Sequence, residues 1–551
     1  MDSLPKKETL TIEFKSDRKN YSDDDLIDEI VGMVNTEGGT LYLGMEDDGT
    51  VTGVASNAHK DIYGLCALIA NKTVPSISAR AKIIETPRGS VMQSQLPKSR
   101  SVIASSKGRI LRRRLKADGT PENIPMYPYE ITSRLSDLRL LDFSIQPLEE
   151  ATIQDFDPVN IERLKAIIQN RDGDKALLGL STEALLSTLH ITTRVGDNTV
   201  PTLAGMLLIG RETRMAELVP TMETVFQVLQ GTDIVLNRSF RKPIIELIDI
   251  FDEYMHAYNP EKEMEYGFFR LSVPEFSVRA FREGLINAFA HRDYSMLGRV
   301  RVQIRDDSLT ISNPGGFIEG ITVENLIYAE PEGRNPGLSD ALKRIGLVEK
   351  TGRGIDRIFE GSILFGRPCP DYSRSTSRTV ELVIPRSKPD IKFSKMLMDE
   401  QNRRGKPLSI EDLLILSAIK ENGRQTMKQL QSVTHIHPVQ LRQTLEELEG
   451  VGLLEELVFP RARVFVFDGK FYDKQGGSPA YTKRSGSDWK KVEEKILHIG
   501  DLQNGILTKQ DVVEKMRVSP GMAYQYLKKL QREGRIELVN AGKYARYRVR
   551  S

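Results

Sequence analysis

The alternation of apolar and polar residues at the start of the chain predicts a small α+β domain. Leu10, Ile12 and Phe14 recur every second residue, as they do in a half-buried strand. Ser22 and the three aspartates after it predict a helix start, because a capping hydroxyl and first-turn acids stabilise the N-terminal end of a helix. A glycine pair then leads into an apolar strand at 41–45 and a hairpin turn at 47–49.

The patterns along the whole chain predict an α+β multidomain protein. The first domain extends over about residues 8–140, and a segment of helical patterns and unknown role follows at 158–250. A second α/β unit is predicted at 251–385, and a polar stretch with two prolines predicts a linker at 386–407. Two similar helical modules follow, and they occupy residues 408–467 and 488–551.

Composition limits the class of protein. The chain has 551 residues, of which 39% are hydrophobic and 28% are charged, and these values are typical of globular rather than disordered protein. No apolar stretch approaches the roughly 20 residues of a membrane span, and no signal peptide is recognisable. Cys66 and Cys369 fit neither a disulfide framework nor a zinc site. We therefore expect a cytoplasmic protein without a membrane partner.

The first domain contains a long glycine-centred motif at 35–49, which is preceded by acidic residues. This stretch closely resembles the Schlafen-type AlbA-like domain, and the resemblance implies binding of nucleic acid, either DNA or RNA. Some members of that family are RNA nucleases that use three carboxylates. Glu8, Glu13 and Asp47 match those positions here, with Glu46 as an alternative to Asp47.

The three matched carboxylates leave two interpretations open. Clustered carboxylates are able to hold Mn²⁺ or Mg²⁺ and activate water against a phosphodiester, which would make the protein a metal-dependent nuclease, for example in phage defence. Alternatively, Glu8 and Glu13 are polar residues beside an edge strand, and Asp47 belongs to a turn. We favour the binding-only interpretation.

A basic run at 107–116 has six cations and no acid, and it predicts contacts with nucleic-acid phosphates. The alternative is an edge strand that charge keeps soluble. The predicted contact residues are Lys107, Arg109, Arg112, Arg113, Arg114 and Lys116.

Residues 278–291 predict an amphipathic helix in the second unit. Glu283, Asn287 and His291 are four residues apart and therefore share one face. Glu283 and Asn287 are spaced as in the N-box helix of GHKL ATPases. This resemblance implies that Asn287 binds Mg²⁺ and that Glu283 orients or deprotonates water if ATP is hydrolysed.

Two glycine turns follow this helix in the order expected of a Bergerat-type α/β sandwich. One is Asn313-Pro-Gly-Gly after a strand pair, and the other precedes a helix, where backbone N–H groups can approach phosphate. The series resembles the divergent GHKL-like domain that accompanies the AlbA-like domain in bacterial and archaeal transcriptional regulators. The resemblance implies that ATP and Mg²⁺ are bound through Asn287, Asn313, Gly315, Gly316, Gly352 and Gly354.

Two features depart from neighbouring ATPase families. Asn313 stands where the superfamily usually has an aspartate that accepts a hydrogen bond from adenine, so the recognition here would lack charge assistance. The alternative is a degenerate domain that is kept as an inactive scaffold. Some relatives carry a RecG-like helicase label, but the sequence contains no G-x-x-x-x-G-K-[ST] phosphate loop.

The C-terminal end is strongly basic. Residues 483–551 have 16 Lys or Arg and 8 Asp or Glu, whereas the whole chain has a net charge of only +2. Ser519-Pro520 opens a helix that resembles the recognition helix of a winged helix-turn-helix, and a basic hairpin follows. The alternative is a winged helix that contacts protein. The predicted DNA contacts are Lys528, Lys529, Arg532, Lys543, Arg546 and Arg548.

The module at 408–467 resembles the same fold but has the opposite charge. Residues 408–459 have 4 basic and 8 acidic side chains, which DNA would repel. We therefore expect this module to contact another domain or to form a homo-oligomer. Together the features predict an ATP-binding, DNA-binding transcriptional regulator whose nucleotide state gates the arrangement of its domains. If the ATP-binding domain hydrolyses ATP, we expect the activity to be weak.

Overall fold

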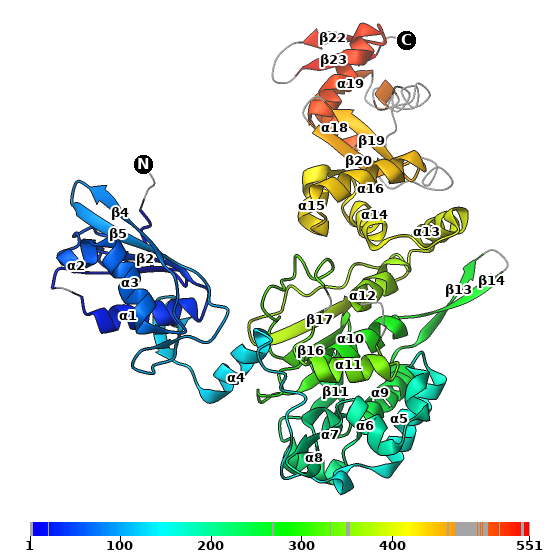
Figure 1. The fold of residues 1–551 in the computed structure, drawn as a ribbon. Helices are drawn as coiled ribbons and strands as arrows, with labels where there is room; N and C mark the ends of the chain where they lie inside the picture. The colour runs from blue at the N-terminus through cyan, green and yellow to red at the C-terminus, as the bar shows by residue number, and fades with distance from the viewer. Residues whose placement is uncertain are drawn as a thin grey trace. The chain divides into compact units, whose positions relative to one another are not determined.

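The computed structural model shows an α+β chain that forms two compact units, Met1–Asp390 and Ile391–Ser551 (Figure 1). None of the described helices is long and apolar enough to cross a membrane. The described residues are 4–19, 21–266, 269–330, 332–348, 353–459, 462–468, 493, 496–497, 499, 505–516, 518, 520–540 and 545–549.

The first unit begins with a four-stranded sheet whose first two strands are parallel and whose other neighbours are antiparallel. Helices α1 (Asp23–Val34) and α3 (Ile62–Lys72) contribute Ile30, Val34 and Ile69 to its main apolar core. In spatial order the strands are β1 (Ile12–Lys15), β2 (Gly39–Leu43), β5 (Gly89–Leu96) and β4 (Arg80–Thr86). The smaller elements of this domain are α2 (Asn57–Lys60), the pair β3 (Thr73–Val74) and β6 (Ala104–Ser105), and the pair β7 (Leu111–Leu115) and β8 (Pro121–Pro125).

The glycine pair between α1 and β2 is required by backbone packing. Gly39 has a φ of +133°, and a Cβ there would lie 2.1 Å from the carbonyl oxygen of Thr11. Only glycine permits this approach without strain, and the approach brings β2 alongside β1. The motif at 35–49 thus has a structural function besides any role in binding.

The segment predicted as a helical connecting region contains strands as well as helices, which corrects that prediction. Helix α4 (Pro128–Asp137) leads into this segment. The last two strands of the segment belong to the sheet of the next domain. Two of its strand pairs are local hairpins that the sequence pattern did not reveal, and only the pairing of one strand with the next domain is long-range. Its elements are η1 (Ile153–Asp155), α5 (Pro158–Asn170), η2 (Lys175–Gly179), α6 (Thr182–Thr188), β9 (Thr192–Val195), β10 (Asn198–Pro201), α7 (Leu203–Ile209), α8 (Glu212–Leu218), β11 (Thr224–Gln230) and β12 (Asp233–Phe240).

The predicted second α/β unit is built on a five-stranded sheet in the order β12-β11-β15-β16-β17. Strand β11 pairs parallel with β15, although about 70 residues separate them in the sequence, so the sheet crosses the boundary expected at 251. The remaining elements are α9 (Ile244–Tyr258), the hairpin β13 (Glu261–Tyr266) and β14 (Phe269–Pro274), α10 (Val278–Ala290), β15 (Val300–Ile304), β16 (Ser308–Pro314), α11 (Pro336–Arg344), α12 (Gly354–Ile363) and β17 (Thr379–Pro385).

The second unit begins with a helix where a linker was predicted. Helix α13 (Ile391–Arg404) buries Phe393, Met396 and Leu397, and Arg404 forms an ion pair with Asp412. The prediction failed because the apolar residues that pack are few and stand among many charges. The module after α13 contains α14 (Ile410–Asn422), β18 (Gln425–Thr426), α15 (Met427–Thr434), α16 (Pro438–Gly450), β19 (Leu454–Phe459) and β20 (Ala462–Phe467).

The last module has its own apolar core, which includes Leu507, Leu527, Leu530 and Ile536. Its three strands form one sheet in the order β21-β23-β22. The described elements are β21 (Ile506–Thr508), α18 (Lys509–Met516), α19 (Pro520–Arg532), β22 (Ile536–Asn540) and β23 (Arg546–Val549).

Candidate functional site

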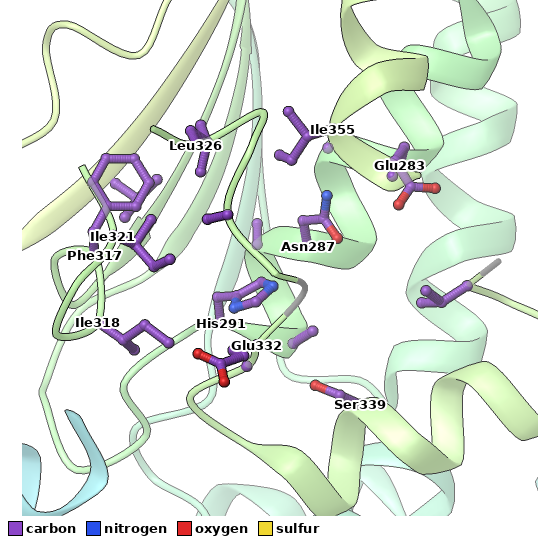
Figure 2. A pocket seen from close by; sticks show the side chains of 18 of the residues that line it. Glu283, Asn287, His291, Phe317, Ile318, Ile321, Leu326, Glu332, Ser339 and Ile355 are labelled. Atoms are coloured by element: carbon purple, nitrogen blue, oxygen red, sulfur yellow. The ribbon is translucent and has the colours of Figure 1, made fainter. Parts of the chain in front are cut away.

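A cavity of about 610 Å³ lies in the first unit, lined by α10, β16, β17, α11, the start of α12 and the segment 316–333 (Figure 2). We call it the α10 pocket. Its lining includes five of the residues predicted to bind nucleotide or activate water. These are Glu283, Asn287, Asn313, Gly316 and Gly354.

Helix α10 presents the predicted polar face to this pocket. The helix starts where the Ser277 side chain accepts a hydrogen bond from the backbone N–H of Ala280 at 3.2 Å. Gly284 lets the sheet approach the helix, because a Cβ there would lie 2.7 Å from the Leu382 side chain. Glu283, Asn287 and His291 all line the cavity, so the shared face expected from their spacing exists.

The three polar residues of α10 differ in electrostatic state. Glu283 is only 6% exposed, and burial raises its pKa, while Arg357 and Arg279 lower it. Burial lowers the pKa of His291 to about 4, and the Arg334 guanidinium contributes to the decrease. The His291 imidazole is therefore neutral at pH 7.

The first glycine turn brings a second strand to the pocket. Asn313 lies near the end of β16 and is buried, and its Nδ2 donates to the carbonyl oxygen of Pro314 at 3.2 Å. Gly315 has a φ of +94°, and a Cβ there would lie 2.8 Å from Cβ of Asp293, so the turn needs glycine. Gly316 lines the pocket, and Gly352 of the second predicted turn lies outside the described residues.

A buried ionic cluster, which sequence reasoning missed, joins this turn to α4. Arg334 is 2% exposed; its Nη1 lies 2.5 Å from Oδ1 of Asp137 and 3.5 Å from Oδ2 of Asp293. Its Nη2 donates to the carbonyl oxygen of Gly316 at 3.1 Å. Burial raises the pKa of Asp137 to about 6; Asp293 adds to the increase and Arg334 opposes it. We call Arg334, Asp137 and Asp293 the Arg334 cluster.

The residue after Arg334 explains why an Arg-Asn-Pro sequence stands there. The Asn335 side chain is 1% exposed, and its Nδ2 donates to the carbonyl oxygens of Ala290 and Arg292 at the end of α10. It therefore satisfies acceptors that a helix end leaves open. Pro336 begins α11 at the position where proline is favoured.

The segment around α4 contacts several walls of the α10 pocket. Ser133 Oγ donates to Oδ2 of Asp293 at 2.5 Å, and Arg134 donates to Glu319 at 2.7 Å. The Asp142 carboxylate accepts from the backbone N–H of Gly337 at 2.7 Å, at the N-terminus of α11. Arg139, which lines the pocket, pairs with Glu332. The link from the N-terminal domain thus touches the pocket directly.

The basic run at 107–116 has acidic partners inside the protein. Five of its six cations form ion pairs, and Arg113 is buried against Glu13 at 1% and 3% side-chain exposure. Two of the other partners come from α1, far along the sequence, and two come from β8 and α4, which follow the run. The pairs are Lys107 with Asp24, Arg109 with Asp28, Arg112 with Glu130, Arg113 with Glu13, and Arg114 with Glu122.

Two of the three carboxylates of the nuclease alternative, Glu8 and Glu13, already have partners inside the protein. Burial raises the pKa of Glu8, and the charges of Glu13 and Asp47 raise it further. Glu8 accepts from the backbone N–H of Phe14 at 3.0 Å, and Glu13 pairs with Arg113 and Lys15. Across the described part of the chain, no group of three His, Cys, Asp or Glu residues is arranged to hold a metal ion.

The predicted DNA contacts of the last module lie at its surface. Lys528, Lys529 and Arg532 are exposed on α19, and Arg546 and Arg548 are exposed on β23. Tyr524 is 49% exposed, and the Lys528 ammonium lies 5.8 Å from the centre of its ring. Lys543 lies outside the described residues.

Comparison with protein families agrees with the two resemblances. Residues 8–119 match the family model described as "Schlafen, AlbA_2", and residues 298–384 match "Putative ATP-dependent DNA helicase recG C-terminal". The chain is similar to Schlafen AlbA-like proteins that carry a RecG-like, ATPase-like domain. The second match begins after α10, so Glu283 and Asn287 lie outside it. Residues 134–225 match a domain of unknown function.

A solved structure supports the fold over most of the chain. The crystal structure of the DIP2311 protein from Corynebacterium diphtheriae is similar with a TM-score of 0.50 and 20% sequence identity. The similarity covers 85% of this chain and 94% of that chain. No curated protein matches the chain.

Proposed function

We propose that the chain is an ATP-binding, DNA-binding regulator in which occupancy of the α10 pocket changes how the N-terminal domain is held. The observation that carries this proposal is the convergence of Asn287, Asn313, Gly316 and Gly354 on one cavity. These residues come from three parts of the sequence. Three of them, Asn313, Gly316 and Gly354, lie within the residues that match an ATPase-like domain, which supports a shared role in binding nucleotide.

The size and charge of the pocket support a nucleotide that enters with a metal ion. Its volume of about 610 Å³ lies within the roughly 300–1,000 Å³ usual for small-molecule sites. Five carboxylates and two basic side chains line it, so a free triphosphate would be repelled. Mg²⁺ commonly binds through phosphates, waters and few protein oxygens, and the half-buried Asn287 amide at the pocket wall fits such a ligand.

The exposed cations of α19 and β23 support DNA binding by the last module. The order of its described elements supports a winged helix, in which α19 would be the recognition helix and β22–β23 the wing. In the other module, α16 exposes Glu446, Glu447 and Glu449, which supports a role in contacts between protein surfaces.

The Arg334 cluster supplies the route by which nucleotide would act on the N-terminal domain. The same guanidinium binds the carbonyl of Gly316 at the pocket and Asp137 at the end of α4. A ligand that moves the glycine turn would therefore alter the contact between Arg334 and Asp137 that holds α4. Coupling of this kind requires a ligand that binds the two arrangements with different affinity.

Calorimetric titration with ATP and Mg²⁺ tests the proposal. We expect saturable binding and at least a roughly tenfold loss of affinity in Asn287→Ala, since the variant removes a metal ligand. Asn237→Ala, an exposed site on β12, is the matched control and should bind normally. Hydrogen exchange in α4 should change when ATP is added. Unchanged ATP binding by folded Asn287→Ala would contradict the metal-bridging role.

Turnover is a separate prediction. If the pocket hydrolyses ATP, Glu283→Ala should still bind nucleotide but release no phosphate, because Glu283 would orient the attacking water. A wild-type protein that releases no phosphate with any nucleic acid present would show that the domain senses ATP without hydrolysing it.

A further inference from the structure

The Glu283 carboxylate lies against the N-terminus of α12. A Cβ built on Gly354, the first residue of that helix, would lie 2.0 Å from Oε1 of Glu283 and 3.0 Å from its Cδ. Figure 2 shows the Glu283 side chain beside this helix, whereas the Asn287 amide lies nearer to Ile355 and the cavity. A carboxylate therefore lies beside the first residue of the helix, although its Oε1 accepts no hydrogen bond from the described backbone there.

The same carboxylate lacks a full set of partners. Oε1 of Glu283 is inaccessible to solvent and has no hydrogen-bond partner among the described residues. A buried charged oxygen without a hydrogen bond is costly. Its nearest compensation is electrostatic, from Arg357 on α12 and from Arg279 on its own helix. The side chain is thus held at this position by the fold rather than by a complete set of hydrogen bonds.

The start of α12 is also the part of the pocket best suited to bind phosphate. The first backbone N–H groups of a helix have no partner within the helix, and the helix dipole favours an anion there. Gly354, Ile355 and Asp356 all line the α10 pocket. A ligand phosphate that reached this helix end would meet the Glu283 carboxylate.

We propose that Glu283 is a specificity-determining residue that competes with ligand phosphate for the N-terminus of α12. The inference rests on the proposed nucleotide function and deepens it. Arg357 and Arg279 compensate the charge of Glu283 itself, so a phosphate at the same helix end adds negative charge that an accompanying divalent cation would have to balance. Protonation of Glu283 or its replacement by a neutral isostere removes the competition.

Protonation gives the proposal a measurable pH dependence. Burial raises the pKa of Glu283, with Arg357 and Arg279 opposing the increase, and the buried Tyr372 of the pocket wall faces the same carboxylate. A lower pH neutralises Glu283 and strengthens the binding of metal-free phosphate. The phosphate also titrates, but it does so equally in wild type and variant, so their difference isolates Glu283.

The test measures the affinity of the full chain for ATP and for inorganic triphosphate, each in EDTA and with Mg²⁺. Glu283→Gln should bind both probes in EDTA about tenfold or more tightly than wild type does. This advantage should shrink as the pH is lowered from 8, because Glu283 becomes protonated in the wild type and its pKa is raised by burial. Glu253→Gln removes the same charge from an exposed position on α9 and should leave both affinities unchanged.

The outcomes separate this inference from the proposed function. If wild type binds ATP with Mg²⁺ and folded Glu283→Gln gains nothing in EDTA, the competition is refuted while the nucleotide function stands. If ATP does not bind but Glu283→Gln binds triphosphate more tightly, the inference stands and the nucleotide function falls. If no protein binds either probe, both are refuted. A water-activating role alone would change phosphate release and leave the affinities in EDTA equal.

Discussion

Two basic regions of this chain differ in how many of their cations pair with carboxylates inside the protein. In 107–116, five of six cations pair with carboxylates, two of which come from α1. On α19 and β23, Lys529 pairs with Glu533 and Arg548 pairs with Glu537. The other predicted contacts on these elements, Lys528, Arg532 and Arg546, are exposed. The comparison teaches that a run of cations identifies a polyanion site only when its counter-charges are not already within the protein.

Deletion of residues 483–551 is the strongest test of this difference. We expect at least a roughly hundredfold loss of affinity for duplex DNA, because the deletion removes all the phosphate contacts predicted for the tail. The salt dependence should also weaken, since each phosphate contact contributes about 0.9 to the slope of log affinity against log salt. Fluorescence anisotropy over a salt series measures both quantities. A tail-less protein with the affinity and salt slope of the full chain would make the N-terminal domain the DNA reader.

Deletion of 408–467 should instead alter the oligomeric state.

Replacement of Arg113 should damage the fold rather than DNA binding. In Arg113→Met, the buried Glu13 carboxylate keeps Lys15 as its ion-pair partner but loses Arg113. Breaking a buried ion pair lowers the free energy of unfolding by about 3–5 kcal/mol. Urea denaturation measures the loss. Because Arg113→Met/Glu13→Gln removes both charges, it should recover part of the stability. A stable Arg113→Met variant with weakened DNA binding would reverse the assignment.

Single replacements in the tail should have smaller but clear effects. Arg532→Ala is expected to weaken DNA binding about tenfold and reduce the salt slope by about 0.9, because it removes one phosphate contact. The effect should be the same for unrelated DNA sequences, since phosphates carry no sequence information. Strong dependence on sequence would mean that Arg532 contacts bases.

The smallest effect is expected at Arg114. This side chain is exposed and pairs with Glu122 at 2.7 Å, and surface pairs contribute about 0–1 kcal/mol. Arg114→Ala should therefore change DNA affinity by less than about twofold, in the same anisotropy assay. A tenfold loss would show that the basic run exchanges its internal partners for phosphates.

The sequence by itself determined the features that depend on neighbouring residues. Helix α1 forms after Ser22, and α10 presents Glu283, Asn287 and His291 on one face, because helix starts and helix faces follow from local spacing. The resemblances to the Schlafen AlbA-like domain and to an ATPase-like domain, sometimes labelled RecG-like, rested on motifs and their order along the chain, and the family matches confirm both.

Only the tertiary structure decided which distant residues meet. The pairing of β11 with β15 placed part of the expected helical region in the central sheet. The Arg334 cluster brought together residues from α4, the end of α10 and the segment before α11. The acids of α1 neutralised cations more than 80 residues away. Spacing along a chain reports neighbours within a few residues, whereas ion pairing and desolvation depend on distances in space that folding alone creates.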